Sequence, residues 1–335
     1  MNTRAKIAII GAGGFGTAMG IVLSRNGHEV RLFGHDPEKA QRLAQTRQNS
    51  TYLPGVPIPE EIAITADAAA ALRGADLAVN AVPTQHTRDI FTKLRPLLSA
   101  ALPVLSLCKG LEQGTGLSGT RILRDVWGVA RPVAALTGPS HAEEVALGLP
   151  TTVVVGAADA ELARQIQGLF NSRVFRVYTS EDLIGLEMGG ALKNVIAIAA
   201  GIIDGLGFGD NAKSGLLTRG LLEMTRYGVA AGARRETFYG LAGLGDLFTT
   251  CVSPHGRNRA LGQRIGRGET LDDVLATTKK VAEGVWTTRS LHQDAGRLRV
   301  EMPITEQIHA VLFEGVGPRA AVEDLMSRAP RPEYA

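Results

Sequence analysis

The chain has 335 residues, of which 44% are hydrophobic and 21% charged. This length exceeds the size of a typical single hydrophobic core and predicts two domains. The formal net charge of +3 argues against nonspecific nucleic-acid binding. Charged residues and glycines interrupt the apolar stretches, which argues against stable membrane insertion.

The two cysteines, Cys108 and Cys251, stand outside any paired framework and predict reduced thiols in a cytoplasmic protein. The N-terminus, which runs straight into a strand, shows no signal-peptide pattern. The seven histidines show neither i, i+4 pairs nor a carboxylate at ligand spacing, so we expect no metal site.

The first predicted element is a buried strand over residues 6–10, a continuous β-branched and alanine run. It leads into the glycine-rich turn of residues 11–16, after which residues 17–25 are typical of a helix. In a strand, glycine turn and helix of this kind, the first glycine makes the turn. The second lets the backbone approach a pyrophosphate, and the third lets the helix pack on the strand. The pattern predicts a dinucleotide site built on Gly11, Gly13 and Gly16.

A second strand is predicted over residues 29–33, and it ends at Gly34 and His35. NAD-preferring domains usually place an acidic residue here to hold the ribose hydroxyls. Asp36 is followed by Pro37, which favours a helix N-cap instead. A histidine without an immediate acid leaves room for a 2′-phosphate. We therefore expect NADP as the cofactor and keep NAD as an alternative.

Short apolar runs separated by helical segments continue to about residue 179 and predict a mostly parallel sheet covered on both faces. The further predicted strands are residues 62–64, 77–79, 104–107, 133–136, 152–155 and 174–177. From residue 180 onward the apolar pattern is helical with glycine breaks. We therefore predict a Rossmann-type, doubly wound α/β domain over residues 1–179 and an all-α substrate domain over residues 180–335.

Polar residues follow several of the predicted strands, at the sheet edge where ligands bind in such folds. Lys109 is a cation placed directly after an apolar strand and beside a glycine, so we expect it to face the cleft. An exposed loop lysine is the alternative. Ser140 follows another strand, although the segment Ser140-His-Ala-Glu143 also fits a helix capping box.

Three segments of the predicted helical domain contain candidate catalytic or anion-binding residues. Lys193 lies in the apolar run of residues 189–198, where burial would lower the pKa of its amine and suit it to acid-base work. A lysine that packs its stem on the core and keeps its head in water is the alternative. Asp246 follows a glycine-rich apolar turn and needs a cationic partner, which we expect to be Lys193. Arg257, Asn258 and Arg259 open a helix and predict an anion site, unless Arg257 and Arg259 only form part of a solvated face.

Eight ordered motifs together resemble the NAD(P)-dependent glycerol-3-phosphate dehydrogenases, from Gly11 to about Ile308. They are GAGxxGTA, CKGLE, TGPS, GGALKNVIAI, LAGLGDL, GRNR, VAEG and EMPITE. The resemblance implies reversible reduction of dihydroxyacetone phosphate to sn-glycerol 3-phosphate by NADH or NADPH. It also implies a role in supplying the glycerol backbone of phospholipids, and a homodimer.

Carried over by motif, Lys193 resembles the proton donor, Asp246 the residue that orients it, and Lys109 a contact that polarises the carbonyl. Asn194 and Thr250 resemble further donors. The positions that match the family's substrate contacts are Lys109, Gly138, Ser140, Lys193, Asp246, Gly256, Arg257 and Asn258. The positions that match its cofactor contacts are Gly11, Gly13, Gly14, Phe15, Gly16, His35, Lys109, Ala142, Arg257, Val281 and Glu283.

Two positions depart from the commoner family pattern, because Gly14 and Gly256 stand where many members have serine. Backbone amides bind phosphate without a hydroxyl, so we expect the mechanism to survive. Two other functions remain open at this point. One is a related reductase acting on another hydroxy acid or ketone, and the other is a cofactor sensor without catalysis.

Overall fold

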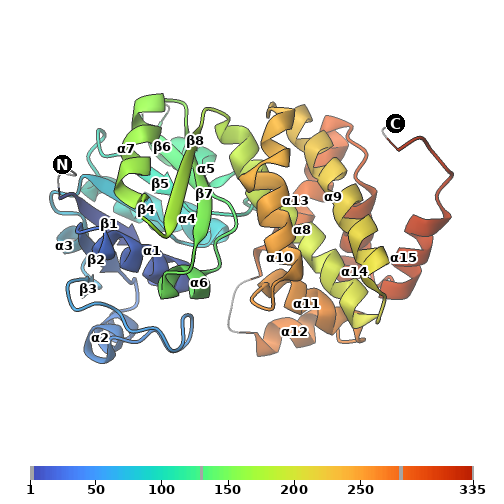
Figure 1. Ribbon diagram of the computed structural model, residues 1–335, viewed down its shortest axis with the longest axis horizontal. Helices are drawn as coiled ribbons and strands as arrows, with labels where there is room; N and C mark the ends of the chain where they lie inside the picture. The colour runs from blue at the N-terminus through green and yellow to red at the C-terminus, as the bar shows by residue number, and fades with distance from the viewer. Residues whose placement is uncertain (1–3, 129–130, 279–281, 334–335) are drawn as a thin grey trace.

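The computed structural model describes residues 4–128, 131–278 and 282–333. Within these ranges the chain forms an α/β domain around one eight-stranded sheet, followed by a helical domain (Figure 1). The predicted fold class is thereby confirmed. The strands are β1 (Lys6–Ile10), β2 (Glu29–Phe33), β3 (Ala63–Thr65), β4 (Leu77–Asn80), β5 (Val104–Ser106), β6 (Val133–Thr137), β7 (Thr151–Ala157) and β8 (Phe175–Ser180).

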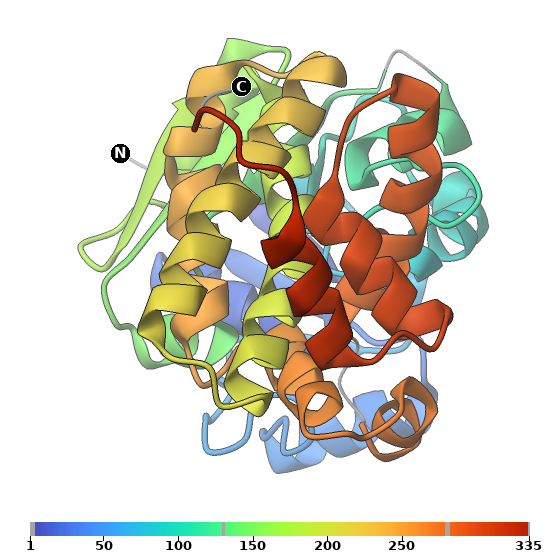
Figure 2. The ribbon, with the colours of Figure 1, turned by 90° about the vertical axis from the view of Figure 1, so that its right-hand side faces the viewer.

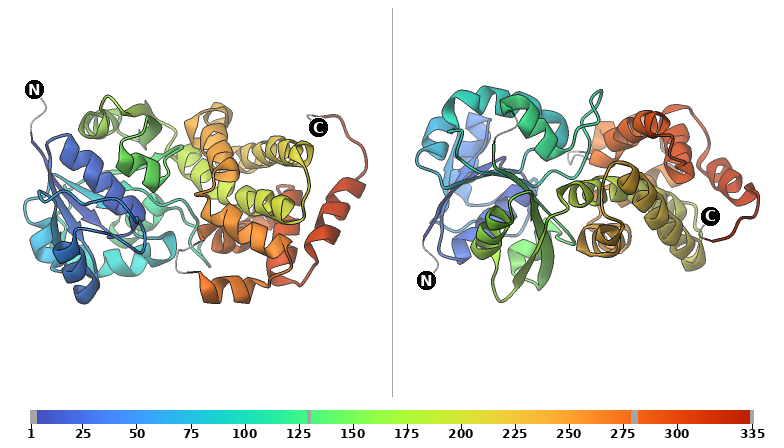
Figure 3. Two further views of the ribbon diagram at one scale, coloured as in Figure 1. Left: turned by 60° about the horizontal axis from the view of Figure 1, so that its bottom comes forward. Right: turned by 90° about the horizontal axis from the view of Figure 1, so that it is seen from above.

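Helices cover both faces of the sheet in the first domain and build the whole of the second (Figure 3). Those of the first domain are α1 (Gly14–Arg25), α2 (Pro37–Thr46), α3 (Ala68–Leu72), α4 (Thr84–Leu94), η1 (Arg95–Leu97), α5 (Gly119–Trp127), α6 (Ala142–Leu147) and α7 (Ala160–Phe170). Those of the second are α8 (Leu183–Gly205), α9 (Asp210–Ala230), η2 (Arg235–Tyr239), η3 (Leu241–Gly245), α10 (Asp246–Val252), α11 (Arg257–Gly266), α12 (Leu271–Thr277), α13 (Glu283–Leu298), α14 (Pro303–Phe313) and α15 (Pro318–Ser327).

The sheet has the strand order β3-β2-β1-β4-β5-β6-β7-β8. Neighbouring strands are parallel except β6 and β7, which are antiparallel. The short helix α6 explains this exception, because its six residues cannot carry the chain back along the sheet to start another parallel strand. The order reverses between β2-β1 and β4, so the carboxyl ends of β1 and β4 form the crevice where doubly wound sheets bind nucleotides.

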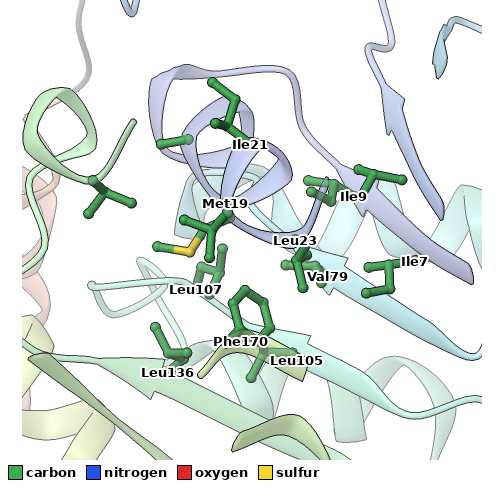
Figure 4. Close-up of a cluster of buried hydrophobic side chains, with 14 of the residues drawn as sticks. Ile7, Ile9, Met19, Ile21, Leu23, Val79, Leu105, Leu107, Leu136 and Phe170 are labelled. Carbon is green, nitrogen blue, oxygen red and sulfur yellow. The ribbon is translucent and has the colours of Figure 1, made fainter. Parts of the chain in front are cut away.

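The core of the first domain lies between the sheet and the helices α1 and α7. Figure 4 shows Met19 and Leu23 of α1 and Phe170 of α7 packed over side chains of the central strands. All three are at most 1% exposed. Burial on this scale fixes α1 against β1, and with it the glycine turn that joins them.

Helix α8 carries the chain from the sheet into the second domain. Asp182 caps its first turn, since its carboxylate accepts a hydrogen bond from the Gly185 amide at 2.9 Å. The helix is long and apolar enough to cross a membrane, but its most apolar stretch is wholly buried inside the protein. We therefore assign α8 as the core helix of the second domain, as Figure 2 shows from the side away from the sheet.

Glycines let α8 and α11 pack with their backbones in contact. A Cβ added at Gly201 would lie 2.0 Å from the Arg259 carbonyl oxygen, and one at Gly262 would lie 2.0 Å from the Ile198 carbonyl oxygen. Any larger residue would push the two helices apart. This close approach brings the start of α11 beside the middle of α8.

Candidate active site

The glycine turn between β1 and α1 has the geometry of a phosphate cradle. Gly11 has a φ of +114°, and a Cβ there would lie 2.8 Å from the Ala81 carbonyl oxygen. A Cβ at Gly16 would lie 2.1 Å from the Gly11 carbonyl oxygen, so α1 packs directly on the turn. Gly13 has no heavy atom within 4 Å of its Cβ position and leaves the start of α1 open to a ligand.

Gly14 is required by the segment that follows α2. A Cβ at Gly14 would lie 2.6 Å from the Tyr52 carbonyl oxygen. The same segment is tied down by Asn49, whose Nδ2 donates to the Ala12 carbonyl at 3.1 Å and to the Thr17 hydroxyl at 2.9 Å. The absence of the serine common at this position therefore follows from close packing over the turn.

The end of β2 leaves His35 exposed near the cradle. Asp36 caps α2, because its Oδ1 accepts from the Lys39 amide at 3.1 Å and its other oxygen pairs with the Lys39 ammonium at 2.9 Å. The predicted N-cap role of Asp36 is confirmed. Its carboxylate is already engaged, so His35 is the polar side chain left free here for the adenosine end of a cofactor.

Lys193 and Asp246 form a buried pair on the helical side. Lys193 Nζ donates to Asp246 Oδ1 at 2.5 Å and to Thr250 Oγ1 at 2.6 Å. The side chains of Lys193 and Asp246 are only 6% and 2% exposed. The sequence-based expectation that these two residues pair is confirmed. The snorkelling alternative for Lys193 is wrong, because its ammonium is buried.

A second lysine shares the same carboxylate. Lys109 Nζ donates to Asp246 Oδ2 at 2.9 Å, so Asp246 bridges two ammonium groups. Burial lowers the pKa of Lys193 to about 8, Asp246 opposes this shift and Lys109 adds to it. Burial alone would raise the pKa of Asp246, but the charges of Lys109 and Lys193 together hold it below its ordinary value. One acid and two bases thus carry a net charge of +1 when both amines are protonated.

Close backbone approach brings these groups together. A Cβ at Gly189 would lie 2.5 Å from the carbonyl oxygen of Ala242, in the π-helical turn η3 that leads into Asp246. A Cβ at Gly190 would lie 2.9 Å from the hydroxyl of Thr137, at the end of β6. The glycine pair before Lys193 therefore lets α8 contact both the strand end and the turn.

Lys109 also contacts the segment that follows β6, where the sequence predicted further polar site residues. Its Nζ donates to the Gly138 carbonyl at 3.0 Å and to the Ser140 hydroxyl at 3.4 Å, and it lies 5.7 Å from the centre of the Phe15 ring. The exposed-loop alternative for Lys109 is wrong. The capping-box alternative for Ser140 is also wrong, because α6 begins with His141 as its N-cap and the Ser140 hydroxyl donates to the Gly138 carbonyl at 2.8 Å.

Two asparagines connect elements of both domains around the lysine cluster. Asn194 Nδ2 donates to the Lys109 carbonyl at 2.6 Å, and Asn258 Nδ2 donates to Asn194 Oδ1 at 2.9 Å. Asn258 Oδ1 in turn accepts from the Gly284 amide at 3.0 Å. This chain of amides joins the Lys109 segment to α8, to the start of α11 and to the start of α13.

The remaining predicted anion-site residues lie at the start of α11. Arg257 is exposed at its first position, whereas Gly256 is buried as its N-cap. A Cβ at Gly256 would lie 2.5 Å from the Thr250 carbonyl oxygen, which explains the loss of serine here. Arg259 does not face a ligand, because its Nε pairs with Asp204 at 2.6 Å.

Two further predicted cofactor residues, Ala142 and Glu283, each lie at the start of a helix. Ala142 is the first residue of α6, after the end of β6. Glu283 opens α13 and accepts from the Thr84 amide at the start of α4 at 2.6 Å, so it spans from the helical domain to the end of β4. Val281 lies outside the described residues.

Two features were not found from the sequence. His141 lies close enough to the cluster for the Lys193 charge, after burial, to lower the pKa of its imidazole. Its position directly after the TGPS motif was the signal in the sequence that could have identified it.

The second feature lies on α13 and α14, where His292 and His309 stack with ring centres 3.8 Å apart and His309 Nδ1 lies 2.8 Å from Glu314 Oε1. Sequence spacing missed this group because its histidines come from different helices. The ligand atoms of His292, His309 and Glu314 lie within 4.8 Å of one another, a spacing that could hold a metal ion.

Comparison with known proteins assigns the family. Two family models, the N-terminal and C-terminal parts of NAD-dependent glycerol-3-phosphate dehydrogenase, match residues 6–163 and 182–323. The chain is 48% identical over 330 residues to a glycerol-3-phosphate dehydrogenase [NAD(P)+] of Geobacillus thermodenitrificans, covering 98% of this chain and 96% of the relative. One from Geobacter sp. strain M21 is 46% identical, covering 96% and 97%. A crystal structure of the Coxiella burnetii glycerol-3-phosphate dehydrogenase superposes with a TM-score of 0.93 at 37% identity, covering 97% of this chain and 99% of that one.

Proposed function

Because the chain belongs to the NAD-dependent glycerol-3-phosphate dehydrogenase family, we propose that it interconverts dihydroxyacetone phosphate and sn-glycerol 3-phosphate with NAD(H) or NADP(H). The observation that carries the proposal is the buried carboxylate of Asp246, shared by the ammonium groups of Lys109 and Lys193. A cofactor sensor would need only the glycine turn. This ion cluster is built for proton transfer.

The first domain fits a nicotinamide dinucleotide. The open backbone at Gly13 and the uncapped start of α1 suit a pyrophosphate. The cofactor, when bound, supplies or accepts the hydride. The residues that we propose to hold it are Gly11, Gly13, Gly14, Phe15, Gly16, His35, Lys109, Ala142, Arg257, Val281 and Glu283. Because Asp36 caps α2 and pairs with Lys39, its carboxylate is not left free to hold the ribose hydroxyls as the acid of NAD-preferring domains does, which supports NADP while leaving NAD usable.

Lys193 is the proposed proton donor for ketone reduction. As hydride reaches the carbonyl carbon, the C=O electron pair moves to the oxygen, and the Lys193 ammonium gives that oxygen a proton. A pKa of about 8 suits the task, because the amine is mostly protonated at neutral pH yet releases its proton readily. Asp246 orients the amine through its 2.5 Å hydrogen bond. Lys109 adds a second positive charge beside the developing alkoxide.

The phosphate group of the substrate is proposed to bind between the two domains. Arg257 and Asn258 open α11, where the helix dipole and free amides favour an anion, and Arg257 is free to swing toward it. Gly138 and Ser140 come from the other side, already in contact with Lys109. The full set of proposed substrate contacts is Lys109, Gly138, Ser140, Lys193, Asp246, Gly256, Arg257 and Asn258.

A rate assay tests the function and the role of Lys193 together. Purified protein is mixed with dihydroxyacetone phosphate and either NADH or NADPH, and loss of the reduced cofactor is followed by absorbance. We expect turnover with both cofactors, and faster turnover with NADPH at limiting concentration. Lys193→Ala should abolish turnover while its affinity for the cofactor stays near that of the wild type. Wild-type turnover in this variant would remove Lys193 from the mechanism.

We also propose a homodimer in the cytoplasm that supplies glycerol 3-phosphate for phospholipid synthesis. The two free cysteines suit a reducing compartment. Leu244, Phe248 and Val252 leave an exposed apolar row along η3 and α10 that a second subunit could cover. Light scattering at micromolar protein should give twice the 35.4 kDa mass of the chain, and the single-chain mass would contradict the dimer.

A further inference from the structure

Glu187 of α8 is a buried carboxylate that caps a helix of the other domain. It is 6% exposed, and its Oε1 accepts from the Thr120 amide at 2.7 Å. Its Oε2 accepts from the Ser118 hydroxyl at 2.7 Å and from the Thr120 hydroxyl at 2.6 Å. Ser118 is the N-cap residue of α5, but its own side chain accepts no capping hydrogen bond. The cap of α5 is therefore supplied across the domain interface.

The capped end of α5 lies against the strand end that leads to Lys109. A Cβ at Gly119 would lie 2.4 Å from Ser106 Oγ and 2.8 Å from Cys108 Cβ. The start of α5 cannot move without disturbing this segment. Glu187 thus contacts, through α5, the backbone that presents Lys109.

A single face of α8 runs along this segment. Glu187, Gly190 and Asn194 are spaced by three and four residues, which places them above one another on one side of a helix. A Cβ at Gly190 would lie 3.6 Å from Lys109 Cγ, and Asn194 Nδ2 donates to the Lys109 carbonyl. Glu187 and Asn194 therefore fix α8 at two points, one before and one after Lys193.

We propose that Glu187 is a positioning residue, which holds α8 in register against the Lys109 segment so that Lys109 and Lys193 share Asp246. The inference rests on the proposed role of Lys193. A buried carboxylate gains little net stability from such hydrogen bonds after its desolvation, so its value lies in fixing one arrangement of the two domains.

Glu223 provides a matched control within the same chain. It is also buried, on α9, and it caps α14 by accepting from the Ile304 amide at 2.8 Å and from the Thr305 amide at 2.9 Å. Burial raises the pKa of both Glu187 and Glu223. The two glutamates therefore differ mainly in what they hold, because Glu223 connects elements of the helical domain alone.

The experiment compares Glu187→Met with Glu223→Met. Both should lower the melting temperature, since each leaves a helix start uncapped. We expect Glu187→Met alone to lower kcat, by about tenfold to a hundredfold, because small misplacements of reacting groups cost rate on this scale. The KM for the reduced cofactor should stay within a few fold of the wild-type value, because the glycine turn is untouched.

The pH profile of kcat separates positioning from general destabilisation. The charged or titratable groups that act on Lys193 are Asp246, Lys109, Cys251 and His141. If Lys109 moves away, its positive charge no longer lowers the pKa of Lys193, and Asp246 is left to Lys193 alone. Both changes raise that pKa. The alkaline limb of the pH profile, where kcat for ketone reduction falls as Lys193 loses its proton, should therefore move to higher pH in Glu187→Met. It should stay in place in Glu223→Met.

Equal effects of the two substitutions on kcat and on the limb would overturn the inference. Should Glu187→Met fail to fold, Glu187→Asp decides, because it keeps the charge but is one methylene too short to reach Ser118 and Thr120 together. An alkaline limb in this variant identical to that of the wild type would also overturn it. Wild-type turnover in Lys193→Ala would instead refute the role of Lys193 on which the inference rests, and a wild-type protein that does not reduce dihydroxyacetone phosphate would refute the proposed function. The three failures are therefore distinguishable.

Discussion

Replacing Asp246 by asparagine tests the electrostatic core of the mechanism. The substitution keeps the size of the side chain but removes the charge that lies 2.5 Å from Lys193 Nζ and 2.9 Å from Lys109 Nζ. The buried ammonium of Lys193 and the half-buried one of Lys109 then share one neutral amide. Because Asp246 raises the pKa of Lys193 in the wild type, that pKa must fall in the variant.

The size of the effect follows from the distance. At an effective dielectric constant of about 20, unit charges separated by 2.5 Å attract by roughly 6 kcal/mol. If only half of this attraction energy is lost in the variant, the protonation constant of Lys193 falls by about a hundredfold. With a wild-type pKa of about 8, the protonated fraction at neutral pH is about nine-tenths. In the variant it falls to about one-tenth, and the lost orientation of the amine costs further rate.

The assay is kcat for ketone reduction, measured as a function of pH at saturating cofactor and substrate. The wild type should lose half its rate near pH 8 and about tenfold for each further pH unit, because the rate follows protonated Lys193. In Asp246→Asn the limb should move to lower pH and the rate at neutral pH should fall by at least tenfold. A limb that stays near pH 8 would refute the electrostatic role of Asp246.

A control variant separates this effect from the loss of any buried aspartate. Asp294 accepts from the Tyr227 hydroxyl at 2.6 Å, pairs with Arg297 and has no contact with the lysine cluster among the described residues. Asp294→Asn should lower thermal stability but leave the alkaline limb at its wild-type pH. A limb moved equally by both substitutions would point to a general loss of structure.

Further predictions concern the cofactor turn, the phosphate site and the half-buried thiol of Cys108. Arg257→Ala should raise the KM for dihydroxyacetone phosphate at least tenfold with a smaller change in kcat, and an unchanged KM would place the phosphate elsewhere. Gly14→Ser should weaken cofactor binding, because its Cβ would lie 2.6 Å from the Tyr52 carbonyl oxygen, and titration of the cofactor by fluorescence measures this. Partial burial raises the pKa of the Cys108 thiol to about 11, so its alkylation at neutral pH should be far slower than that of a free thiol, and rapid labelling would contradict the raised pKa.

The local features of the fold could be predicted from the sequence. All eight strands lie within three residues of their expected positions. Continuous apolar runs identify the central strands, such as β1, β4 and β6, which are buried on both faces. The N-cap at Asp36 followed from its neighbour Pro37. The pairing of Lys193 with Asp246 followed from chemistry, because each buried charge required a partner and the other supplied it.

The sequence failed where a contact joins elements that are far apart in the chain. Ser140 fits the capping-box pattern locally, yet the position of Lys109 draws its hydroxyl into the site. Glu187 meets Thr120 across 67 residues, and Glu283 meets Thr84 across 199. No spacing rule reports such pairs, because the two domains create them only when they pack together.

In the proposed mechanism, the shared carboxylate gives a physical reason for the site to favour the transition state over the bound ketone. The cluster of Lys109, Lys193 and Asp246 carries a net charge of +1 in a place where water is largely excluded, which is costly while the substrate carbonyl is neutral. That cost appears as the lowered pKa of Lys193. When hydride transfer turns the carbonyl oxygen into an alkoxide, the unbalanced positive charge gains the partner it lacked. The stabilisation therefore develops with the reaction, and it depends on the two domains placing one lysine each against the same carboxylate.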